Sequence, residues 1–458
     1  VGGRSVGVPG SVRMLEAAHK RHGKLPWSAL FQPAITLAEQ GFRMSPRLNT
    51  QLKAETALRN DAQARAYFYA ADGEPHAVGT LMKNPALAEV LRGIAARGSA
   101  ALSAGPVAAD IVRRVRGHAT NPGLLTEADL AGYTAKRRES ICTDWKAVWR
   151  VCGFPPPSSG HIAVMQILGL LERTTPVSQP LADKLPGADW LHTYTEAARL
   201  AYADRAQYLG DPDFVAPPAG RWTSLLDDTY LRQRAALIGR ESMKTAKPGV
   251  PAGAASALSA QAEQPEFGTS HISIVDGDGR AIAMTTTIED VFGARLMSDG
   301  GTGKAGGFLL NNELTDFSFV PTDADGKPIA NRVQPGKRPR SSMSPMLVFD
   351  KRDGKLAMSL GSPGGAAIIH FAAKTLVGTL EWGLDAQRAI DLPNFGSFNG
   401  PTVLERGRFP AATIEALKAR GHLVNEIDMT SGLQAIQRRG GGWFGGADPR
   451  REGVVMGD

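Results

Sequence analysis

The sequence predicts a layered α/β sandwich, and three features of its pattern support that fold class. Apolar residues recur at helical spacing through most of the first half, two strand-like runs meet at a Gly-rich turn near residue 277, and helical spacing returns after the last strands. Helices, then paired strands, then helices again are typical of helices packed against sheet. The 458 residues exceed the roughly 250–300 that one core holds, so we expect two layers of organisation or one large domain decorated with helices. The pattern does not fix the strand order.

The first half is predicted to be mainly helical. Pro155–Gly160 interrupts the chain before a strong helix, and Thr126 has the residue type and position of an N-cap before a short one. Between these two points, Tyr133–Thr143 and Ala147–Gly153 are expected to form a hairpin. The other predicted helices are Ser11–His22, Ser28–Gln40, Pro46–Leu58, Pro85–Ala96, Ala108–Arg116, His161–Glu172 and Ala188–Leu209.

The amino-acid composition changes at residues 240–268. This segment is rich in small residues and proline and is predicted to form a linker. After the linker, the turn Asp276–Gly279 predicts a hairpin between strands at 271–275 and 281–287. Further strands are expected at 308–310, 343–349 and 356–360, and helices at 366–380 and 411–420.

Composition and charge exclude several classes of protein. Apolar residues make up 42% of the chain and charged residues 21%, as in ordinary globular enzymes. No run of about 18 apolar residues occurs, so no transmembrane helix is predicted. The net charge of +7 suits anionic small molecules, but the only dense basic cluster, Lys136–Arg138, is too short to predict a nucleic-acid partner.

The two cysteines, Cys142 and Cys152, fall on the two strands of the predicted hairpin at 133–153. They form either a disulfide, which fits an oxidising compartment, or two buried thiols. No signal peptide opens the chain, and Val1-Gly2-Gly3 is not a natural initiation, so we expect the chain to begin inside a longer precursor.

Common catalytic and cofactor motifs are incomplete. Gly3–Gly7 has the spacing of a nucleophile elbow but no strand before it, and Ser298–Ala305 lacks the first glycine and last hydroxyl of a phosphate loop. His19 and His22 share a helix face with no carboxylate or cysteine to complete a zinc site. We therefore expect neither a metal nor another cofactor.

Hydroxyls, carboxylates and glycines are concentrated in residues 268–365. Taken singly, threonines in strands and glycines in turns are ordinary. Taken together and in this order, the motifs resemble the γ-glutamyltranspeptidases, also called glutathione hydrolases, which are N-terminal-nucleophile hydrolases. The motifs that carry the resemblance are Gly268–His271, Thr285–Thr287, Leu309–Asp316, Arg338–Pro345 and Gly361–Gly365, with support from Gly7–Gly10, Pro155–Gly160 and Ala447–Arg450.

The resemblance implies a four-layer αββα sandwich and a precursor that cuts itself between Gly268 and Thr269. Residues 1–268 would be the large-subunit-like part, ending in the linker, and residues 269–458 the small catalytic part. The cut exposes an α-amine whose ordinary pKa is near 7.7–8.0, so Thr269 supplies both nucleophile and base. In the family, a sheet strand and a carboxylate-binding arginine precede the part that this chain matches; either the native protein lacks them, or they precede Val1 in the longer precursor.

The resemblance also implies a role for each site residue. Thr287 would orient Thr269, and the amides of Gly364 and Gly365 would form the oxyanion hole. The hydroxyls of Ser341 and Ser342 would hold the substrate α-carboxylate. The carboxylates of Glu313 and Asp316 would hold its α-ammonium, with Glu289 standing where many members have asparagine.

The expected activity is γ-glutamyl transfer from glutathione or similar amides to water or to an amino acid or dipeptide, with the two fragments remaining associated. By resemblance, the compartment is the periplasm or the cell exterior. Two alternatives stay open: an acylase of the cephalosporin or glutaryl type, and an unprocessed inactive relative.

Overall fold

The computed structural model describes residues 1–254, 257–262, 264 and 268–457, which form two compact units. The first unit comprises residues 1–137 and 287–315, and the second comprises 138–286 and 316–458. Each unit therefore draws on both sides of Thr269. The predicted large part (1–268) and small part (269–458) are defined by the expected cut before Thr269 and do not coincide with these two units. That division of the chain stays a prediction.

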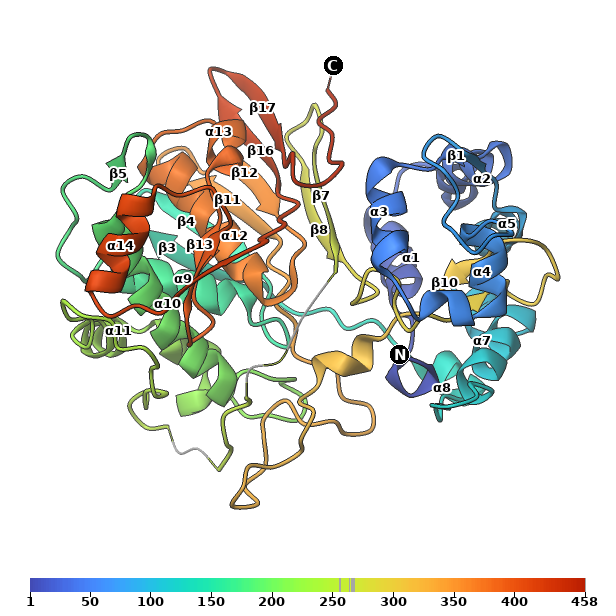
Figure 1. Ribbon diagram of the computed structural model, residues 1–458, viewed down its shortest axis with the longest axis horizontal. Coiled ribbons are helices and arrows are strands. Elements are labelled where there is room, and N and C mark those ends of the chain that lie inside the picture. The colour runs from blue at the N-terminus through green and yellow to red at the C-terminus, as the bar shows by residue number, and fades with distance from the viewer. Residues whose placement is uncertain (255–256, 263, 265–267, 458) are drawn as a thin grey trace. The chain divides into compact units, whose positions relative to one another are not determined.

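The first unit is helical, with two short antiparallel ribbons (Figure 1). Thr126 and Asp129 form a capping box at α8, and prolines begin α3, α5 and α7 at a position where the helix needs no N–H. Its helices are α1 (Ser11–His22), α2 (Gln32–Gln40), α3 (Pro46–Ala54), α4 (Ala62–Phe68), α5 (Pro85–Arg97), α6 (Ala100–Ser103), α7 (Pro106–Arg116) and α8 (Glu127–Gly132). Its ribbons pair β1 (Phe42–Arg43) with β2 (Leu81–Met82) and β9 (Met297–Ser298) with β10 (Phe308–Leu309). It also holds the 3₁₀ turns η1 (Gly3–Ser5), η2 (Trp27–Phe31) and η3 (Leu58–Asn60).

Two apolar clusters hold the first unit together. One gathers Ile94 of α5 and Ile111 of α7 around Leu310, and the other packs Leu52 and Phe68 against Phe292. Because Leu310 and Phe292 come from 287–315, the late segment is part of the helical core rather than an appendage.

The second unit is built on a six-stranded antiparallel sheet of order β17-β16-β12-β11-β4-β3. The strands are β3 (Ile141–Trp145), β4 (Trp149–Gly153), β11 (Met346–Asp350), β12 (Leu356–Gly361), β16 (Gln434–Arg439) and β17 (Gly442–Ala447). The hairpin β7 (Ser270–Val275) and β8 (Ala281–Thr286) forms a separate two-stranded sheet. Smaller sheets pair β5 (Leu181–Ala182) with β6 (Leu185–Pro186), and order β13 (Phe395–Gly396), β14 (Thr402–Glu405) and β15 (Val424–Ile427).

The central strand β12 separates a helical layer from the β7–β8 hairpin. Successive side chains of a strand point to opposite faces. Met358 and Leu360 accordingly belong to the apolar core shared with the helices, whereas the Ser359 hydroxyl donates to Ser273 Oγ of β7 at 3.0 Å. The layers of the second unit are therefore helices, sheet and hairpin, in that order.

The helical layer explains the long apolar runs of the middle sequence. α9 is buried at every residue except its last, and most of the 21 residues of α10 are buried, as expected for helices enclosed in a core. The helices are α9 (Gly160–Leu171), α10 (Ala188–Tyr208), α11 (Asp228–Ala235), α12 (Ile368–Leu376), α13 (Ala386–Asp391) and α14 (Ala411–Ala419). Shorter turns are η4 (Pro218–Gly220), η5 (Trp222–Leu226), η6 (Glu313–Asp316), which spans the unit boundary, η7 (Gly365–Ala367) and the π turn η8 (Val377–Glu381). No helix in the described ranges is long and apolar enough to cross a membrane.

Most predicted elements occur within a few residues of their expected bounds, with two main differences. The predicted helix at 28–40 is divided into a 3₁₀ turn and α2, and the predicted strand at 133–143 begins only at Ile141. Helices α4, α11 and α13 and strands β13, β14, β15, β16 and β17 are among the elements that were not predicted. The linker prediction falls partly on residues 255–256, 263 and 265–267, which lie outside the described residues; Ser259 and Gln261 in its described part hydrogen-bond to Pro328 and Ala206.

Cys142 and Cys152 lie opposite each other in the β3–β4 register and form a disulfide. The bond closes a loop of ten-residue separation at the outer strands of the sheet. We expect reduction to lower the free energy of unfolding by about 2–3 kcal/mol, the loop-closure value for a ring of this size.

The test is a denaturant titration of the wild type with and without reductant. A Cys142→Ser/Cys152→Ser double variant is the control, because it should match the reduced wild type and ignore the reductant. An unchanged midpoint on reduction of the wild type would contradict the prediction.

Candidate active site

Thr269 directly precedes strand β7, and its hydroxyl donates a hydrogen bond to the carbonyl oxygen of Gly268. The Thr269 carbonyl accepts a hydrogen bond of 3.2 Å from the guanidinium of Arg451. The side chain of Thr269 is thus next to the peptide bond that it is predicted to attack. The carbonyl oxygen of Thr269 itself is held by Arg451.

Two residues after Thr269, His271 lies near the start of β7, where it contacts both strands of the hairpin and the end of β12. Its Nδ1 and Nε2 lie 2.8 Å from Thr285 Oγ1 and 3.1 Å from Ser273 Oγ. Burial lowers the pKa of His271 to about 3, so the ring is neutral. Its ring lies against Gly361 at the end of β12, where an added Cβ would be 2.3 Å from Cε1. Only glycine at 361 lets the strands approach this closely.

The turn after β12 requires glycine for its backbone as well as for space. Gly364 and Gly365 have φ of 135° and 57°, in the left-handed region that other residues rarely adopt. A Cβ on Gly364 would also meet the Phe371 ring at 2.5 Å. The turn is held by the Ser362 hydroxyl, which donates to the Pro363 carbonyl and accepts from the amide of Gly432.

Arg451 links Thr269 to the segment beside this turn. Besides Thr269, its guanidinium contacts the Thr430 carbonyl at 3.0 Å. The carboxylate of Asp448 holds the same segment by accepting from the Ser431 hydroxyl and the Leu433 amide. Arg451 immediately follows the motif Ala447–Arg450, which supports the resemblance, but its role at Thr269 was not predicted.

Ser341 and Ser342 are held by Ser159 and Arg205, which were not predicted as site residues. The Ser342 hydroxyl accepts from Arg205 Nη2 at 2.5 Å, and the Ser341 carbonyl accepts from the amide and hydroxyl of Ser159, both at 2.7 Å. Arg205 Nε in turn donates to Ser159 Oγ at 2.8 Å. Nothing in the helical pattern of α10 distinguishes Arg205, so only the fold reveals this contact.

The first unit contains Thr287, Glu289 and Glu313. The Thr287 hydroxyl accepts from the amide of Glu289 at 2.7 Å, and the buried Glu289 carboxylate accepts from Asn312 and from Thr315, the latter at 3.2 Å. Burial and the negative charge of Glu289 raise the pKa of Glu313 to about 8. These two carboxylates form an acidic pair that retains a proton at neutral pH.

The predicted site residues are thus divided between the two units. Thr287, Glu289 and Glu313 belong to the first, whereas Gly268, Thr269, Asp316, Ser341, Ser342, Gly364 and Gly365 belong to the second. Asp316 opens the late segment of the second unit, and its carbonyl accepts from Asn331 at 2.7 Å. The catalytic and binding roles of all these residues remain predictions.

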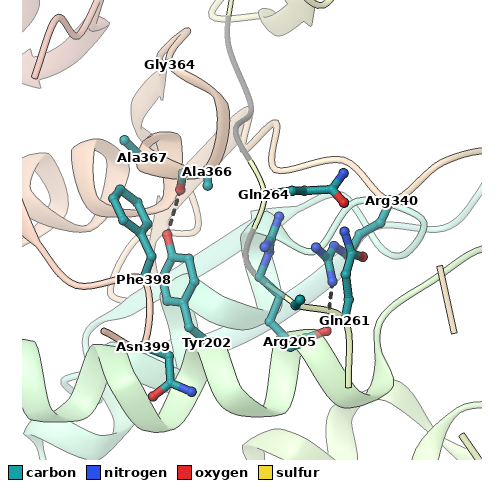
Figure 2. Close-up of a pocket in the computed structure, with 12 residues that line it drawn as sticks. Tyr202, Arg205, Gln261, Gln264, Arg340, Gly364, Ala366, Ala367, Phe398 and Asn399 are labelled. Atoms are coloured by element: carbon teal, nitrogen blue, oxygen red, sulfur yellow. Dashed lines mark hydrogen bonds between the residues drawn. The ribbon is translucent and has the colours of Figure 1, made fainter. Parts of the chain in front are cut away.

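A cavity of about 400 Å³ lies within the second unit and has Gly364 in its wall. Figure 2 shows Arg205 and Arg340 reaching it from different segments, beside Gln261 and Gln264. We call it the Gly364 cavity. Its size is that of a small-molecule site.

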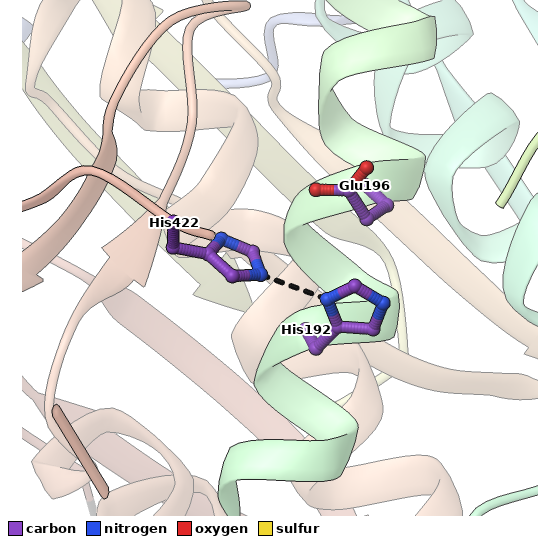
Figure 3. A group of neighbouring side chains, drawn as sticks. All are labelled: His192, Glu196 and His422. Atoms are coloured by element: carbon purple, nitrogen blue, oxygen red, sulfur yellow. Dashed lines mark hydrogen bonds between the residues drawn. The ribbon is translucent and has the colours of Figure 1, made fainter. Parts of the chain in front are cut away.

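One group of side chains within the described residues has the donor types of a metal site: His192, Glu196 and His422 (Figure 3). Each is already occupied by hydrogen bonds. Burial lowers the pKa of His422 to about 3. His192 Nε2 lies 2.9 Å from the Gly239 carbonyl oxygen, and its Nδ1 lies 2.7 Å from His422 Nε2.

The third member of the group is equally occupied. Glu196 forms a buried ion pair with Arg199 at 2.6 Å, and it also accepts from the amide of Met243 at 2.8 Å. The remaining nitrogen of His422 lies 2.7 Å from the Thr402 hydroxyl. A metal ion would have to break several of these bonds, so we interpret the group as structural.

Comparison with known proteins gives similarities over almost the whole chain. The sequence profile described as Gamma-glutamyltranspeptidase matches residues 1–458. The glutathione hydrolase proenzyme of Escherichia coli (strain K12) is 34% identical over 453 residues, which are 97% of this chain and 73% of that protein. The acylase ACY 1 proenzyme of Pseudomonas sp. (strain V22) is 31% identical over 448 residues, 98% of this chain and 74% of that protein.

A solved structure extends the likeness to three dimensions. The crystal structure of cephalosporin acylase from Bacillus halodurans has a TM-score of 0.82 and 25% identity, covering 99% of this chain and 78% of that one. The predicted α/β fold of the N-terminal-nucleophile hydrolase type is confirmed.

The contact between His271 and Gly361 can be used to test how Thr269 is positioned. We expect Gly361→Ala to displace the ring and the start of β7, and so to slow chain cleavage before Thr269 at least tenfold. Intact-mass measurement over time after purification follows the cleavage.

The matched control is Gly277→Ala in the β7–β8 turn, where an added Cβ meets nothing within 4 Å. That variant should be processed like the wild type. Equal rates for Gly361→Ala and the wild type would show that this contact does not position Thr269.

Proposed function

This chain belongs to the γ-glutamyltranspeptidase family, and on that basis we propose that it is a self-processing γ-glutamyl hydrolase and transferase that acts on glutathione and other γ-glutamyl amides. The observation that supports this most directly is the hydrogen bond from the Thr269 hydroxyl to the Gly268 carbonyl oxygen, at the peptide bond that is predicted to be cut. The glycine turn at 364–365 and the acidic pair of the first unit supply the remaining chemistry.

Self-cleavage would begin with attack of Thr269 Oγ on the carbonyl carbon of Gly268. The C–N bond breaks, the hydroxyl proton goes to the departing nitrogen, and an ester joins Gly268 to Thr269 Oγ. Water then hydrolyses this ester, which leaves a carboxylate on Gly268 and an α-amine on Thr269. Thr269 changes its bonding in this step, and Arg451 keeps its backbone in place by donating a hydrogen bond to the Thr269 carbonyl oxygen.

The new α-amine would act as the base for Thr269 Oγ in catalysis. Attack on the γ-carbonyl of the substrate forms a tetrahedral intermediate, whose oxyanion is stabilised by the amides of Gly364 and Gly365. Such donors contribute roughly 2.7–4 kcal/mol each. Loss of the amine leaves a γ-glutamyl ester on Thr269, which water or an acceptor amine cleaves. Thr287, directly after β8, would orient Thr269.

Substrate recognition would follow charge. A γ-glutamyl group carries an α-carboxylate and an α-ammonium, which require donors and carboxylates respectively. Ser341 and Ser342 supply hydroxyl donors, while Glu289, Glu313 and Asp316 supply carboxylates. This assignment favours γ-glutamyl compounds over acyl groups that lack the ammonium.

The two fragments would remain associated after the cut. In the second unit, β4 from 1–268 pairs with β11 from 269–458 along five residues, and α9 packs against α12. Cleavage at Gly268 breaks none of these contacts. We also place the protein in the periplasm or outside the cell, where the Cys142–Cys152 disulfide is stable.

The acylase relatives support a second candidate with the same nucleophile but a glutaryl or cephalosporin-type acyl group. Such a group lacks the α-ammonium, so the acidic pair of the first unit would have no cation to bind. An unprocessed inactive relative is the third candidate, and the processing experiment below excludes it or favours it.

The nucleophile is tested by Thr269→Ala, which should remain a single chain and hydrolyse no γ-glutamyl-p-nitroanilide. Thr269→Ser is the matched control, because it keeps a hydroxyl and should still yield two fragments. Intact mass and release of p-nitroaniline are the measurements.

Cleavage that persists in Thr269→Ala would move the nucleophile elsewhere. A processed wild type that cleaves glutaryl-p-nitroanilide but not the γ-glutamyl compound would favour the acylase. A wild type that stays whole and inactive would favour the silent relative.

The acidic pair predicts how substrate binding depends on pH. Below pH 8 Glu313 holds a proton, because its pKa is raised to about 8, and an ammonium must displace that proton to bind. The KM for γ-glutamyl-p-nitroanilide should therefore fall as pH rises from 6 to 8, by up to about tenfold per unit for one proton.

Glu313→Gln should raise KM at pH 8 and flatten its pH profile. Glu74→Gln, which removes an exposed carboxylate of the same unit, is the control and should keep the wild-type profile. A wild-type KM that is constant or increases from pH 6 to 8 would contradict the proposed role of the pair.

A further inference from the structure

A hydrogen bond from α10 holds the turn that carries the predicted oxyanion donors, and the proposed mechanism does not use it. The Tyr202 hydroxyl donates to the carbonyl oxygen of Ala366 at 2.6 Å. Ala366 belongs to η7, the 3₁₀ turn that directly follows Gly364 and precedes α12. Figure 2 shows this bond at the wall of the Gly364 cavity. The bond therefore joins a buried helix to the turn whose amides are predicted to stabilise the oxyanion.

The turn needs such a connection because its own sequence is flexible. Gly364 and Gly365 have φ of 135° and 57°, and glycine has more conformational freedom to lose on folding than any other residue. Within the turn, the amide of Ala367 donates to the Gly364 carbonyl at 3.2 Å, and the amide of Ile368 donates to the Gly365 carbonyl. These local bonds close the turn but do not tie it to another element. The Tyr202 hydroxyl supplies a tie to α10.

The Tyr202 ring is itself fixed by aromatic neighbours. The residue is 4% exposed, its ring stacks on the ring of His370 with centroids 5.1 Å apart, and it meets Phe398 edge-on at 5.6 Å. His370 is buried, with Nδ1 3.1 Å from the Tyr194 hydroxyl and Nε2 3.1 Å from the Ser397 carbonyl. Burial lowers the pKa of His370 to about 3, so this ring is neutral near neutral pH. Packing therefore sets the position of the Tyr202 hydroxyl.

The position of the turn matters because an oxyanion hole is sensitive to small displacements. Its N–H donors act at about 2.7–3.1 Å from the oxyanion, and a displacement of about 1 Å costs about a hundredfold in rate. A tie that keeps the glycine amides in place is therefore worth more to the rate than to the stability of the fold.

We propose that Tyr202 is a positioning residue for the reaction. Its hydroxyl fixes η7 through the Ala366 carbonyl, and this keeps the two glycine amides of the turn directed at the oxyanion. The inference rests on the proposed function for the role of these amides, but the connection between Tyr202 and the turn does not depend on that function. Acylation of Thr269 and hydrolysis of the ester both pass through an oxyanion, so a loosened turn slows both steps.

The same helix supplies a matched control. Tyr208 of α10 is 7% exposed, and its hydroxyl donates to the carbonyl oxygen of Gly249, also at 2.6 Å. Tyr202→Phe and Tyr208→Phe each remove one hydroxyl and one bond to a backbone carbonyl while the ring stays. Both variants should therefore lose a similar amount of stability in a denaturant titration.

The kinetic experiment compares the processed wild type with the two variants. Tyr202→Phe should lower kcat for γ-glutamyl-p-nitroanilide about tenfold or more, while KM stays within about twofold of the wild type, because acylation and deacylation slow together. Tyr208→Phe should keep the wild-type kcat and KM. A merely structural role for Tyr202 would give the two variants the same kinetic constants.

Two inhibitors separate the oxyanion site from ordinary binding. With the γ-boronic acid analogue of glutamate, Thr269 Oγ adds to boron and the hydroxyl proton passes to the Thr269 α-amine. The adduct is tetrahedral, as the intermediate is. Tyr202→Phe should bind this analogue about tenfold or more weakly and bind glutamate as the wild type does, because only the tetrahedral state uses the oxyanion donors.

Hydrogen exchange reports on the turn itself and requires no activity. The amides of Ala367 and Ile368, which close the turn, should exchange about fivefold or more faster in Tyr202→Phe than in the wild type. In Tyr208→Phe they should exchange at the wild-type rate.

The proposal is overturned if these two amides exchange at the wild-type rate in Tyr202→Phe, if its kcat stays within about twofold of the wild type, or if Tyr208→Phe loses as much kcat. A wild type that cleaves no γ-glutamyl amide would refute the proposed function. Faster exchange in Tyr202→Phe alone would in that case still support the inference that Tyr202 holds the turn.

Discussion

The contact between the His271 ring and Gly361 is the constraint on which the rest of the second unit depends. It seats β7 on the central strand β12, and β7 begins one residue after Thr269. The same strand continues into the glycine turn at 364–365. One close approach between two strands therefore sets both the chain position that is predicted to be cut and the turn that is predicted to stabilise the oxyanion. A side chain at 361 would separate them.

Polar groups inside the fold are organised by long-range partners rather than by neighbours in sequence. From α10, Arg199 donates to the Thr402 hydroxyl and Arg205 to the Ser342 hydroxyl, and Asp204 accepts from Tyr230 and Arg234. Buried charges are tolerated because each is met by a group from another segment. This explains how an enclosed helix can carry several charged residues without losing stability.

Charge is also separated between the two units. The acidic pair Glu289–Glu313 belongs to the first unit, whereas the buried arginines of the Gly364 cavity belong to the second. A zwitterionic acyl donor needs both kinds of group, and an acyl group without an ammonium needs only one.

The sequence by itself determined the elements and the motifs, because capping residues, prolines and apolar spacing are local. It was sufficient for α1, for the capped α8, for the β7–β8 hairpin and for the order of the hydroxyl, carboxylate and glycine motifs. It missed β16 and β17, whose sequence has no strong alternation, and it missed Arg205 and Arg451. Arg205 contacts Ser342, 137 residues away along the chain, and Arg451 contacts Thr269, 182 residues away. Only the tertiary structure could decide these, because a hydrogen bond across the fold leaves no periodic trace in a single sequence.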